Sequence, residues 1–334
     1  MPGRDNAVTP AAARVLAAIP PASGAVVMGT GIVSIDLTVG GHETLSRVLL
    51  VLAAAVWVGL GLVLVGRVLT DRPRVVHEAA SPAALTGVAG TAVLGSRLAL
   101  LGWHRVGGAL LVVALCLWLL LVPSVLRHWV TPTVGVSFVL DVSTDSLAVL
   151  AAILAAEEQI RWLAVASLVA IGLGLAIYVF VLARFDLRQL VVGHGDHWVA
   201  GGALAIATLA CGKAAQATQA IGSLHGLSDG LGRTALALWA AAMLWLPVLI
   251  VCELVAPRLS YDARRWSTVF PVGMYAACSF TVGEVEDIGG LVDFARVWTW
   301  VAFSLWLVVL AALIRRGLAT WSADAGAVRG EPSG

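Results

Sequence analysis

The amino-acid sequence predicts an all-α integral membrane protein with ten transmembrane helices. Three observations support this fold class. Hydrophobic residues make up 60% of the 334-residue chain and charged residues only 12%, whereas about half apolar is already typical of water-soluble domains. Apolar segments of about 20 residues, the length that crosses a bilayer, recur along the whole chain. Their composition also alternates, because one segment contains Gly, Ser and Thr and the next is nearly pure hydrocarbon.

Ten segments have the length of a span and follow each other through short connections. They are 21–39, 45–66, 82–102, 106–126, 132–155, 160–183, 198–222, 232–255, 266–283 and 295–314. Residues 1–20 form a cytoplasmic N-terminal segment, and they contain no uninterrupted apolar stretch, so we expect no cleaved signal peptide. Residues 21–316 then form the ten-span transmembrane domain, and residues 317–334 a polar, disordered cytoplasmic tail.

The basic residues predict that both termini lie in the cytoplasm. Cytoplasmic loops of membrane proteins carry an excess of Lys and Arg, and most basic residues of this chain fall on the side that holds the two termini. The opposite side holds only Arg47, Arg97, Arg105, Arg161, Lys213, Arg233 and Arg296. An even number of spans places both ends on the same side. We therefore expect a multi-pass plasma-membrane protein with both ends inside the cell.

The alternating composition predicts five helical hairpins, each pairing a polar inner helix with an apolar outer helix. Three odd-numbered spans begin with Pro and then Gly, in PPASG (20–24), SPAALTG (81–87) and TPTVG (131–135). Pro at the first helical position wastes no hydrogen bond, and Ser81 or Thr131 can cap the helix. The alternative is that Gly, Ser and Thr only allow close helix packing in lipid. Packing alone would not explain why they occur in every second span.

Polar residues in the odd-numbered spans fall on single helix faces. Residues three, four or seven apart share one side of a helix, and such faces would together enclose a narrow path. The faces are Gly24, Gly31, Ser34 and Thr38 in the first span, Thr133, Ser137, Asp141 and Thr144 in the fifth, and Ala205, Thr208, Gly212, Gln216 and Gln219 in the seventh.

Charged residues inside the spans are functional candidates, because each costs several kcal/mol unless it faces a cavity or a partner. Asp36, Arg97, Asp145 and Lys213 lie at a similar depth in four odd-numbered spans. The alternative is that they are interfacial or form structural ion pairs, such as Arg97 with Asp145. We expect Asp36 and Glu284 to be interfacial, whereas Lys213 lies well inside its span and can line the path.

The sign of a transported charge has arguments on both sides. All odd-numbered spans run from inside to outside, so five helix N-termini, each with a partial positive charge, open toward the cytoplasm. Together with Arg97 and Lys213 this favours anions, whereas Asp141 and Asp145 oppose them. The candidates for lining the path or binding an anion are Gly31, Ser34, Gly90, Arg97, Ser137, Thr144, Thr208, Lys213, Gln216 and Cys278.

Other classes of function find little support in the sequence. A net charge of +1 gives no indication of nucleic-acid binding, and all four cysteines fall inside apolar runs, which argues against disulfides or a zinc site. The HGDH motif at 194–197 has no second ligand cluster, so we expect its two His to be solvated loop residues. No nucleotide-binding or hydrolase motif is present. We expect no enzymatic activity, no metal and no cofactor.

A Phe–Pro pair interrupts the ninth span within TVFPVGMYAACSF (268–280). Pro271 cannot donate a hydrogen bond to the carbonyl of Ser267, and it disfavours ideal helical angles at Phe270. Such a break is tolerated where the freed backbone faces protein or water. The residues leave two interpretations open: Phe270 is an aromatic plug that blocks and dehydrates ions in a narrow path, or it packs beside a structural proline.

Two stretches resemble the tellurite-resistance/C4-dicarboxylate transporter family, which includes the bacterial TehA proteins and the plant guard-cell slow anion channels. They are PPASGAVVMGTGIVSIDL in the first span and RRWSTVFPVGMYAACSF in the ninth. The number of spans, the cytoplasmic termini and the alternating composition fit the family along the chain. The resemblance implies a rosette of five hairpins with the odd helices around a central pore, so that 21–316 is a pore domain. It also implies a homotrimer with one pore per subunit and no cofactor.

The resemblance further implies transport of small anions, malate-like dicarboxylates or tellurite. In the family a Phe of the ninth helix occludes the pore; Phe270 matches it, which makes Phe270 and Pro271 the gate. The seventh span departs from the family because it lacks a Gly-Pro-Pro-Gly, and Lys213 and Asp145 have no match. On the basis of the resemblance we expect an anion channel or permease. The alternatives are a proton-coupled dicarboxylate carrier that uses Asp141 or Asp145, and a non-transporting sensor or enzyme that uses the HGDH loop.

Overall fold

The structure of the protein, a computed structural model, describes residues 19–192, 195–257 and 262–329, with side chains described as far as residue 318 except that of Ala263. These residues form helices and turns without a strand; one isolated β-bridge joins Thr133 and Phe185. The long helices are α2 (Gly24–Val39), α3 (Glu43–Thr70), α5 (Thr86–Leu100), α6 (His104–Arg127), α7 (Val139–Glu158), α8 (Arg161–Leu182), α10 (Trp198–Ala220), α11 (Ser228–Val255), α12 (Trp266–Val285) and α13 (Gly289–Arg329). The short helices are η1 (Pro21–Ser23), α4 (Arg72–Glu78), η2 (Pro82–Leu85), η3 (Gly135–Phe138), α9 (Gln189–Val192), η4 (Gly222–Leu227) and η5 (Ala263–Arg265).

Nine helices in the described part of the chain are long and apolar enough to cross a membrane. This agrees with the prediction of an all-helical, multi-pass membrane protein. The remaining predicted span, 266–283, forms the 20-residue helix α12 but is not among the nine. Its Pro271 and its Gly, Ser and Thr residues make it less apolar than the others. That α12 is a tenth span stays a prediction.

The long helices divide into two classes by burial. The percentages below are the buried share of an 18-residue apolar segment in each helix. This share is 100% in α7, 94% in α10, 78% in α5 and 67% in α2, against 17–28% in α3, α6, α8, α11 and α13. Nearly all residues of α12 are buried as well. We call α2, α5, α7, α10 and α12 the inner helices and the other five long helices the outer helices. The large apolar side chains exposed on the outer helices, such as Leu62 and Leu120, suit a lipid environment.

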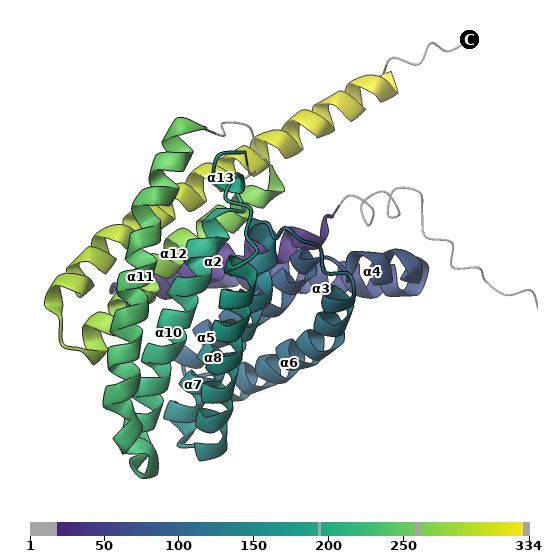
Figure 1. The fold of residues 1–334 in the computed structure, drawn as a ribbon. Helices are drawn as coiled ribbons and strands as arrows, with labels where there is room; N and C mark the ends of the chain where they lie inside the picture. Colours follow the sequence, from purple (N-terminus) through teal and green to yellow (C-terminus); the bar gives the residue numbers. More distant parts are fainter. Residues whose placement is uncertain (1–18, 193–194, 258–261, 330–334) are drawn as a thin grey trace, which may run out of the picture.

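Each inner helix is followed in the chain by the outer helix against which it packs. The pairs are α2 with α3, α5 with α6, α7 with α8, α10 with α11, and α12 with α13. Figure 1 shows these helices packed side by side in one bundle, with α13 projecting beyond it. The connections are short, and Gly41 and Gly102 supply left-handed turns with φ of +87° in two of them, a conformation that glycine adopts without steric cost.

Contacts between inner helices follow a closed cycle, from α2 to α5, α7, α10, α12 and back to α2. Glycine allows close approach along this cycle. A methyl group on Gly31 of α2 would lie 2.7 Å from Val93 of α5, and one on Gly202 of α10 would lie 2.7 Å from the ring of Pro271 on α12. Such distances are too short for a real carbon contact, so these positions require glycine.

Tryptophans of the outer helices donate hydrogen bonds to hydroxyl groups of the inner helices. Indole N–H groups donate to threonine or serine at about the same distance in four places. The pairs are Trp57 to Thr91 at 2.9 Å, Trp118 to Thr144 at 3.0 Å, Trp239 to Ser279 at 2.8 Å and Trp306 to Thr30 at 3.0 Å. Part of the polar character of the inner helices therefore serves the contact with the outer layer.

The predicted N-caps have different outcomes. Ser81 accepts a hydrogen bond from the backbone N–H of Ala83 at 3.3 Å and caps η2, as predicted. Thr131 caps no helix, because η3 begins only at Gly135. The intervening Thr133 instead exchanges backbone hydrogen bonds with Arg184 and Asp186, at 2.9 and 3.0 Å. These bonds tie the entry of α7 to the end of α8.

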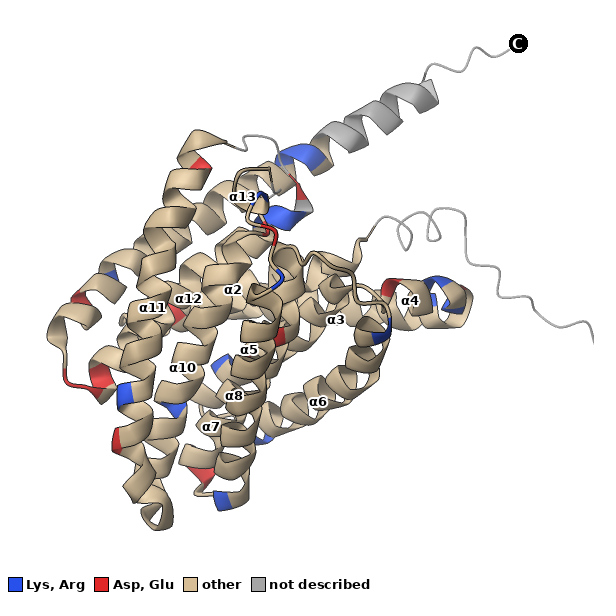
Figure 2. Cartoon of the chain, viewed as in Figure 1, with Lys and Arg blue, Asp and Glu red and all other residues tan. Residues whose placement is uncertain are grey.

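The described charges lie mainly at helix ends, and most of the bundle in Figure 2 is tan. At the C-terminal end, α13 continues to Arg329 and so covers most of the tail predicted to be disordered. No proline occurs from Gly289, where α13 begins, until Pro332. The helix can therefore continue past the predicted span, because extending an existing helix needs no new nucleation step. Residues 1–18 of the predicted N-terminal segment lie outside the described residues.

Candidate functional site

A narrow cavity of about 40 Å³ lies between the five inner helices. Each inner helix contributes residues at helical spacing, so one face of every inner helix meets there. The lining residues are Ile32, Ile35 and Val39 of α2; Val93, Ser96 and Leu100 of α5; Ser146, Val149 and Ile153 of α7; Ile206, Leu209 and Lys213 of α10; and Met274, Ala277, Phe280, Thr281 and Glu284 of α12. We call this space the central cavity.

The wall of the central cavity is mainly aliphatic. Its two serines bond back to their own helices, Ser96 to the carbonyl of Ala92 at 2.9 Å and Ser146 to that of Val142 at 2.7 Å. A wall of this kind offers little to replace the water around an ion, so it acts as a barrier to hydrated ions as long as it is narrow.

Lys213 is the basic residue on this wall. Its Nζ donates to Oε1 of Gln216 at 3.0 Å, and Nε2 of Gln216 donates to Oε2 of Glu284 at 3.4 Å. Glu284 is exposed, as expected for an interfacial residue. The chain from Lys213 through Gln216 to Glu284 therefore joins the cavity wall to the molecular surface.

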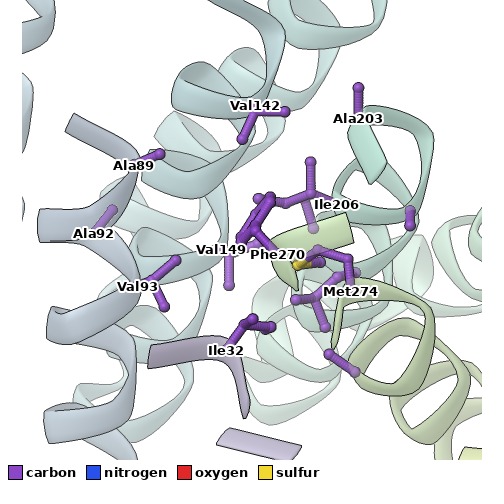
Figure 3. Close-up of a cluster of buried hydrophobic side chains, with 14 of the residues drawn as sticks. Ile32, Ala89, Ala92, Val93, Val142, Val149, Ala203, Ile206, Phe270 and Met274 are labelled. Atoms are coloured by element: carbon purple, nitrogen blue, oxygen red, sulfur yellow. The ribbon is translucent and has the colours of Figure 1, made fainter. Parts of the chain in front are cut away.

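Phe270 is 1% exposed and belongs to a cluster of buried side chains that includes residues of the central cavity. In Figure 3 its ring stands among side chains of all five inner helices. Labelled around it are Ile32 of α2; Ala89, Ala92 and Val93 of α5; Val142 and Val149 of α7; Ala203 and Ile206 of α10; and Met274 of α12. Five of these residues also line the cavity. The ring thus stands next to residues of the cavity wall.

The neighbouring Pro271 packs directly on α10. A methyl group on Gly202 would meet Cβ, Cγ and Cα of this proline at 2.7 to 3.0 Å. Because helix α12 runs unbroken through Pro271, the proline acts here as a packing surface whose position depends on Gly202.

A second hollow, of about 290 Å³, lies at the N-terminal ends of the inner helices. Its lining comes from the entries of all five. These residues are Ala22, Ala83, Thr86, Val134, Val136, Gln189, Asp196, Arg264 and Ser267. Ser267 lies one turn before Phe270 on α12, and Met274 of the central cavity lies one turn after it. Phe270 therefore separates the two spaces along α12.

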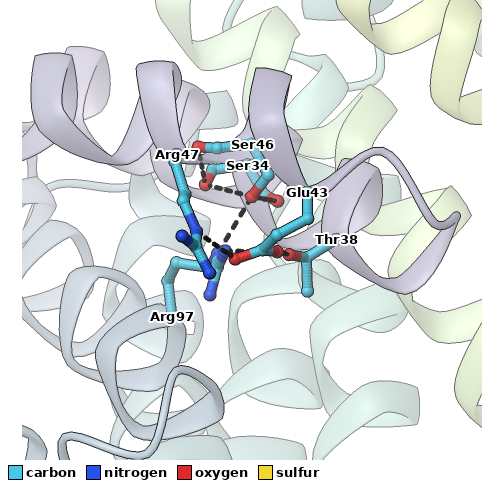
Figure 4. A network of polar contacts seen from close by, with 6 residues as sticks. All are labelled: Ser34, Thr38, Glu43, Ser46, Arg47 and Arg97. Atoms are coloured by element: carbon cyan, nitrogen blue, oxygen red, sulfur yellow. Dashed lines mark hydrogen bonds and ion pairs between the residues drawn. The ribbon is translucent and has the colours of Figure 1, made fainter.

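Arg97 is held in a polar network between α5 and the α2–α3 hairpin and is not among the residues that line the central cavity (Figure 4). Its Nη2 donates to both carboxylate oxygens of Glu43 at 3.0 and 2.9 Å, and its Nε donates to Oγ of Ser46 at 3.0 Å. Glu43 also accepts from Thr38 and Arg47. The partner of Arg97 is thus Glu43, and not Asp145 as the ion-pair alternative suggested.

Three further candidates lie in helix interfaces. Ser34 and Ser46 bond to each other's backbone carbonyls at 2.8 and 2.6 Å, which joins α2 to α3. Gly31 faces Val93 of α5, and a methyl group on Gly90 would lie 3.0 Å from the carbonyl oxygen of Gly24. None of Ser34, Gly31 and Gly90 lines the central cavity.

The remaining candidates also bond within or between helices and are absent from the cavity lining. The hydroxyls of Thr144 and Thr208 donate to carbonyls of their own helices at 2.9 and 2.8 Å. Ser137 accepts from the backbone of Val134 at 3.2 Å, and the thiol of Cys278 donates to Tyr275 at 3.5 Å. Of the predicted lining residues, the structure therefore brings Lys213 to the cavity, with Gln216 bound to it.

Two other expectations differ from the structure. Asp36 is fully buried, with one carboxylate oxygen against Gly273 of α12, so it is not interfacial. In the HGDH motif, His194 lies outside the described residues, whereas His197 is fully buried with Nε2 3.8 Å from the Glu253 carboxylate. No group of three possible metal ligands occurs among the described residues.

The apolar lining is what the sequence did not reveal. The expected faces contained Ser34, Thr144 and Thr208, but the cavity faces contain Ile35, Val149 and Ile206. Aliphatic residues three or four apart in each inner helix could have indicated the cavity lining. Such a stripe is, however, also the pattern of an ordinary hydrophobic core. Only the closed cycle of helices shows that these stripes meet.

Comparison with known proteins gives a family and two relatives. Residues 18–314 match the SLAC1 family, described as voltage-dependent anion channels. Two uncharacterized membrane proteins of Mycobacterium tuberculosis, from strains CDC 1551 and ATCC 25618, are each 31% identical over 132 residues. These matches cover 37% of this chain and 65% of each relative, so the chain spans less than two thirds of their length.

Proposed function

Because this chain belongs to the SLAC1 family of voltage-dependent anion channels, whose match covers residues 18–314, we propose that it carries small anions across a membrane along the axis of the inner helices. Inorganic anions and C4-dicarboxylate or tellurite-type oxyanions are the proposed substrates. Phe270 and Pro271 form the proposed gate. We place the protein in the plasma membrane with both termini in the cytoplasm and as a homotrimer.

The proposed architecture is a rosette of five hairpins with ten spans. Its support is the burial of α2, α5, α7, α10 and α12, their closed cycle of contacts, and the pairing of each with an apolar outer helix. On this proposal α12 is the tenth span. Its lower apolar character matters little in the centre of the bundle, because other helices shield it from lipid.

The proposed path runs from the N-terminal hollow, past Phe270, into the central cavity. The five helix N-termini direct partial positive charge toward the first space, which favours anions there. Lys213 attracts them at the other end. The observation that carries the proposal is the position of Phe270 between the two spaces, surrounded by all five inner helices.

In the proposed mechanism an anion loses part of its water at the aliphatic wall and passes when the aromatic ring turns aside. The barrier at Phe270 comes from both volume and dehydration. Lys213 and the partial positive charge of the helix N-termini supply favourable charge. Arg97 acts indirectly, by holding α5 against the α2–α3 hairpin through Glu43 and Ser46.

The test is anion flux through purified protein in liposomes, with Phe270→Ala compared with wild type. Removing the ring opens a continuous path, so we expect higher chloride and nitrate flux. Phe138→Ala is the matched control, because Phe138 is equally buried but packs against Tyr178 and Phe185. Each Phe→Ala change costs about 3–5 kcal/mol of stability, so flux is normalised to folded protein. Equal flux in wild type and Phe270→Ala would refute the gate.

A proton-coupled carrier is the second candidate function, and one observation favours it. Asp141 and Asp145 of α7 are fully buried carboxylates to which no other residue of the described structure donates a hydrogen bond. Saturable flux that follows a pH gradient, and that is lost in Asp→Asn variants, would identify a carrier. Currents proportional to voltage and unaffected by the gradient would identify a channel.

A further inference from the structure

Asp141 and Asp145 lie one turn apart on α7, so their carboxylates share one face of the helix. Both residues are 0% exposed. No other residue of the described structure donates a hydrogen bond to any of their four carboxylate oxygens, and the two carboxyl groups lie within hydrogen-bond range of each other. We call these two residues the aspartate pair.

The aspartate pair does not line the central cavity. The cavity is lined from α7 by Ser146, Val149 and Ile153. Asp145 instead faces α8, because a methyl group on Gly174 would overlap its carboxylate. The pair is therefore packed behind the wall of the proposed path, and glycine at position 174 leaves the room that one of its carboxylates occupies.

Two neutral titratable side chains lie near enough to the pair to interact with it electrostatically, Tyr178 of α8 with Asp141 and Cys211 of α10 with Asp145. The hydroxyl of Tyr178 accepts a hydrogen bond from the Trp245 indole at 3.0 Å and donates none to the aspartate pair in the described structure.

Basic groups on the helices packed against α7 are placed elsewhere. Arg97 of α5 is bound to Glu43, and Lys213 of α10 to Gln216. The other basic residues lie at the ends of α6 and α8, as His104, Arg105, Arg127 and Arg161. In the described structure no ion pair reaches either carboxylate of the pair.

Two like charges cannot both persist at such a site. Burying one unpaired carboxylate is already costly, and a second one a turn away adds direct repulsion. The space is filled by protein atoms, as the contact with Gly174 shows, so a hydrated metal ion does not fit. The ligand that neutralises the pair is the proton.

We propose that Asp141 and Asp145 form a proton-binding site behind the path, and that release of its proton lowers anion flux. On release, a carboxylic O–H bond breaks, the proton passes to water, and a buried negative charge remains on α7. Val142, next to Asp141, contacts the Phe270 cluster (Figure 3), and Ser146, next to Asp145, lines the cavity. The new charge therefore acts on a segment that touches both. The effect on flux rests on the proposed function, whereas the binding of the proton does not.

Infrared spectroscopy of the purified full-length protein tests the proton site without any transport. Protonated aspartate has a carboxylic C=O band that carboxylate lacks. We expect Asp141→Asn and Asp145→Asn each to change this band at neutral pH. Asp293→Asn, which alters an exposed aspartate paired with Arg296, leaves it unchanged. A spectrum unaffected by both substitutions in the pair would overturn the proposal.

A glycine substitution provides a second test in which both aspartates remain. Gly174→Ala pushes a methyl group onto Asp145, so the band should shift or lose intensity. Gly172→Ala lies on the same helix with nothing within 4 Å of the added carbon, and it should have no effect. Equal spectra for the two variants would show that Asp145 does not face α8.

Liposome flux then tests the effect on transport. As pH rises until the band disappears, we expect anion flux to fall on the order of tenfold, the effect of a unit charge about 10 Å away at an effective dielectric constant of about 20. Asp141→Asn/Asp145→Asn should keep the low-pH flux throughout. An unchanged pH response in this double variant refutes the regulatory part. Absence of flux at every pH, with the band present, refutes the proposed function but leaves the proton site intact.

Discussion

Arg97 of α5 and the aspartate pair of α7 are buried to nearly the same degree, but only the arginine has a partner of opposite charge. Arg97 is 1% exposed and reaches Glu43 and Ser46 within 3.0 Å. Asp141 and Asp145 are 0% exposed, and no other residue of the described structure donates a hydrogen bond to their oxygens. The comparison teaches that depth alone does not assign a role to a charge in a span. A satisfied charge fastens helices together, whereas an unsatisfied one has to change its protonation state.

The largest expected effect is the loss of the carboxylate that balances Arg97. Glu43→Gln leaves a buried guanidinium without a counter-charge. We expect a loss of about 3 kcal/mol, the lower end of the range for a broken buried pair, because Glu43 is itself partly exposed. The free energy of unfolding in mixed micelles measures it. Glu43→Gln/Arg97→Met should recover part of the loss; a double variant no more stable than Glu43→Gln would contradict the pairing.

A smaller effect is expected from crowding the unsatisfied site. Gly174→Ala should cost about 2 kcal/mol, as is common for overpacking, because the methyl group meets the Asp145 carboxylate. Gly172→Ala should be neutral or slightly stabilising, since alanine is the better helix former. The same unfolding measurement applies. If the two variants are equally stable, α7 and α8 are not as close as described.

The smallest effect is expected from neutralising the pair itself. Asp145→Asn keeps the shape and replaces one member of a pair that holds a proton, so stability should change by less than about 1 kcal/mol at neutral pH. At alkaline pH the variant should be more stable than wild type, because it has no carboxyl proton to lose. A large loss at neutral pH would show that Asp145 is ionised and bound to a partner, which would make it resemble Arg97.

The sequence predicted the helices and their two classes well. The alternation between Gly, Ser or Thr-containing spans and aliphatic spans matches the buried and exposed helices, because lipid contact demands an all-apolar surface and helix contact does not. The predicted range 45–66 lies within α3, Glu43–Thr70, and 160–183 nearly coincides with α8, Arg161–Leu182. Long apolar segments therefore predict membrane-spanning helices reliably.

The orientation of each inner helix could not be predicted in the same way. Gly31 serves close packing, Ser34 binds Ser46, and Thr144 accepts from Trp118, so small and polar residues face neighbours rather than the cavity. Arg97 was paired with Asp145 as one alternative because the two lie at similar depth, but they face different helices. The spacing of residues in one sequence shows which of them share a helix face. It does not show which neighbouring helix that face contacts.

The short connections within each hairpin also bear on how the chain enters a membrane. Helix α12 is the least suited to partition into lipid alone, but α13 follows it after residues 286–288, and Trp298 of α13 donates to the carbonyl of Val272 at 3.0 Å. We expect the insertion machinery to accept α12 as half of a hairpin rather than as a single segment. Glycosylation mapping of α12 with and without α13 would decide this, since efficient insertion of α12 alone would disprove it. The chain would then insert into the membrane as five successive helical hairpins, each made of one inner and one outer helix.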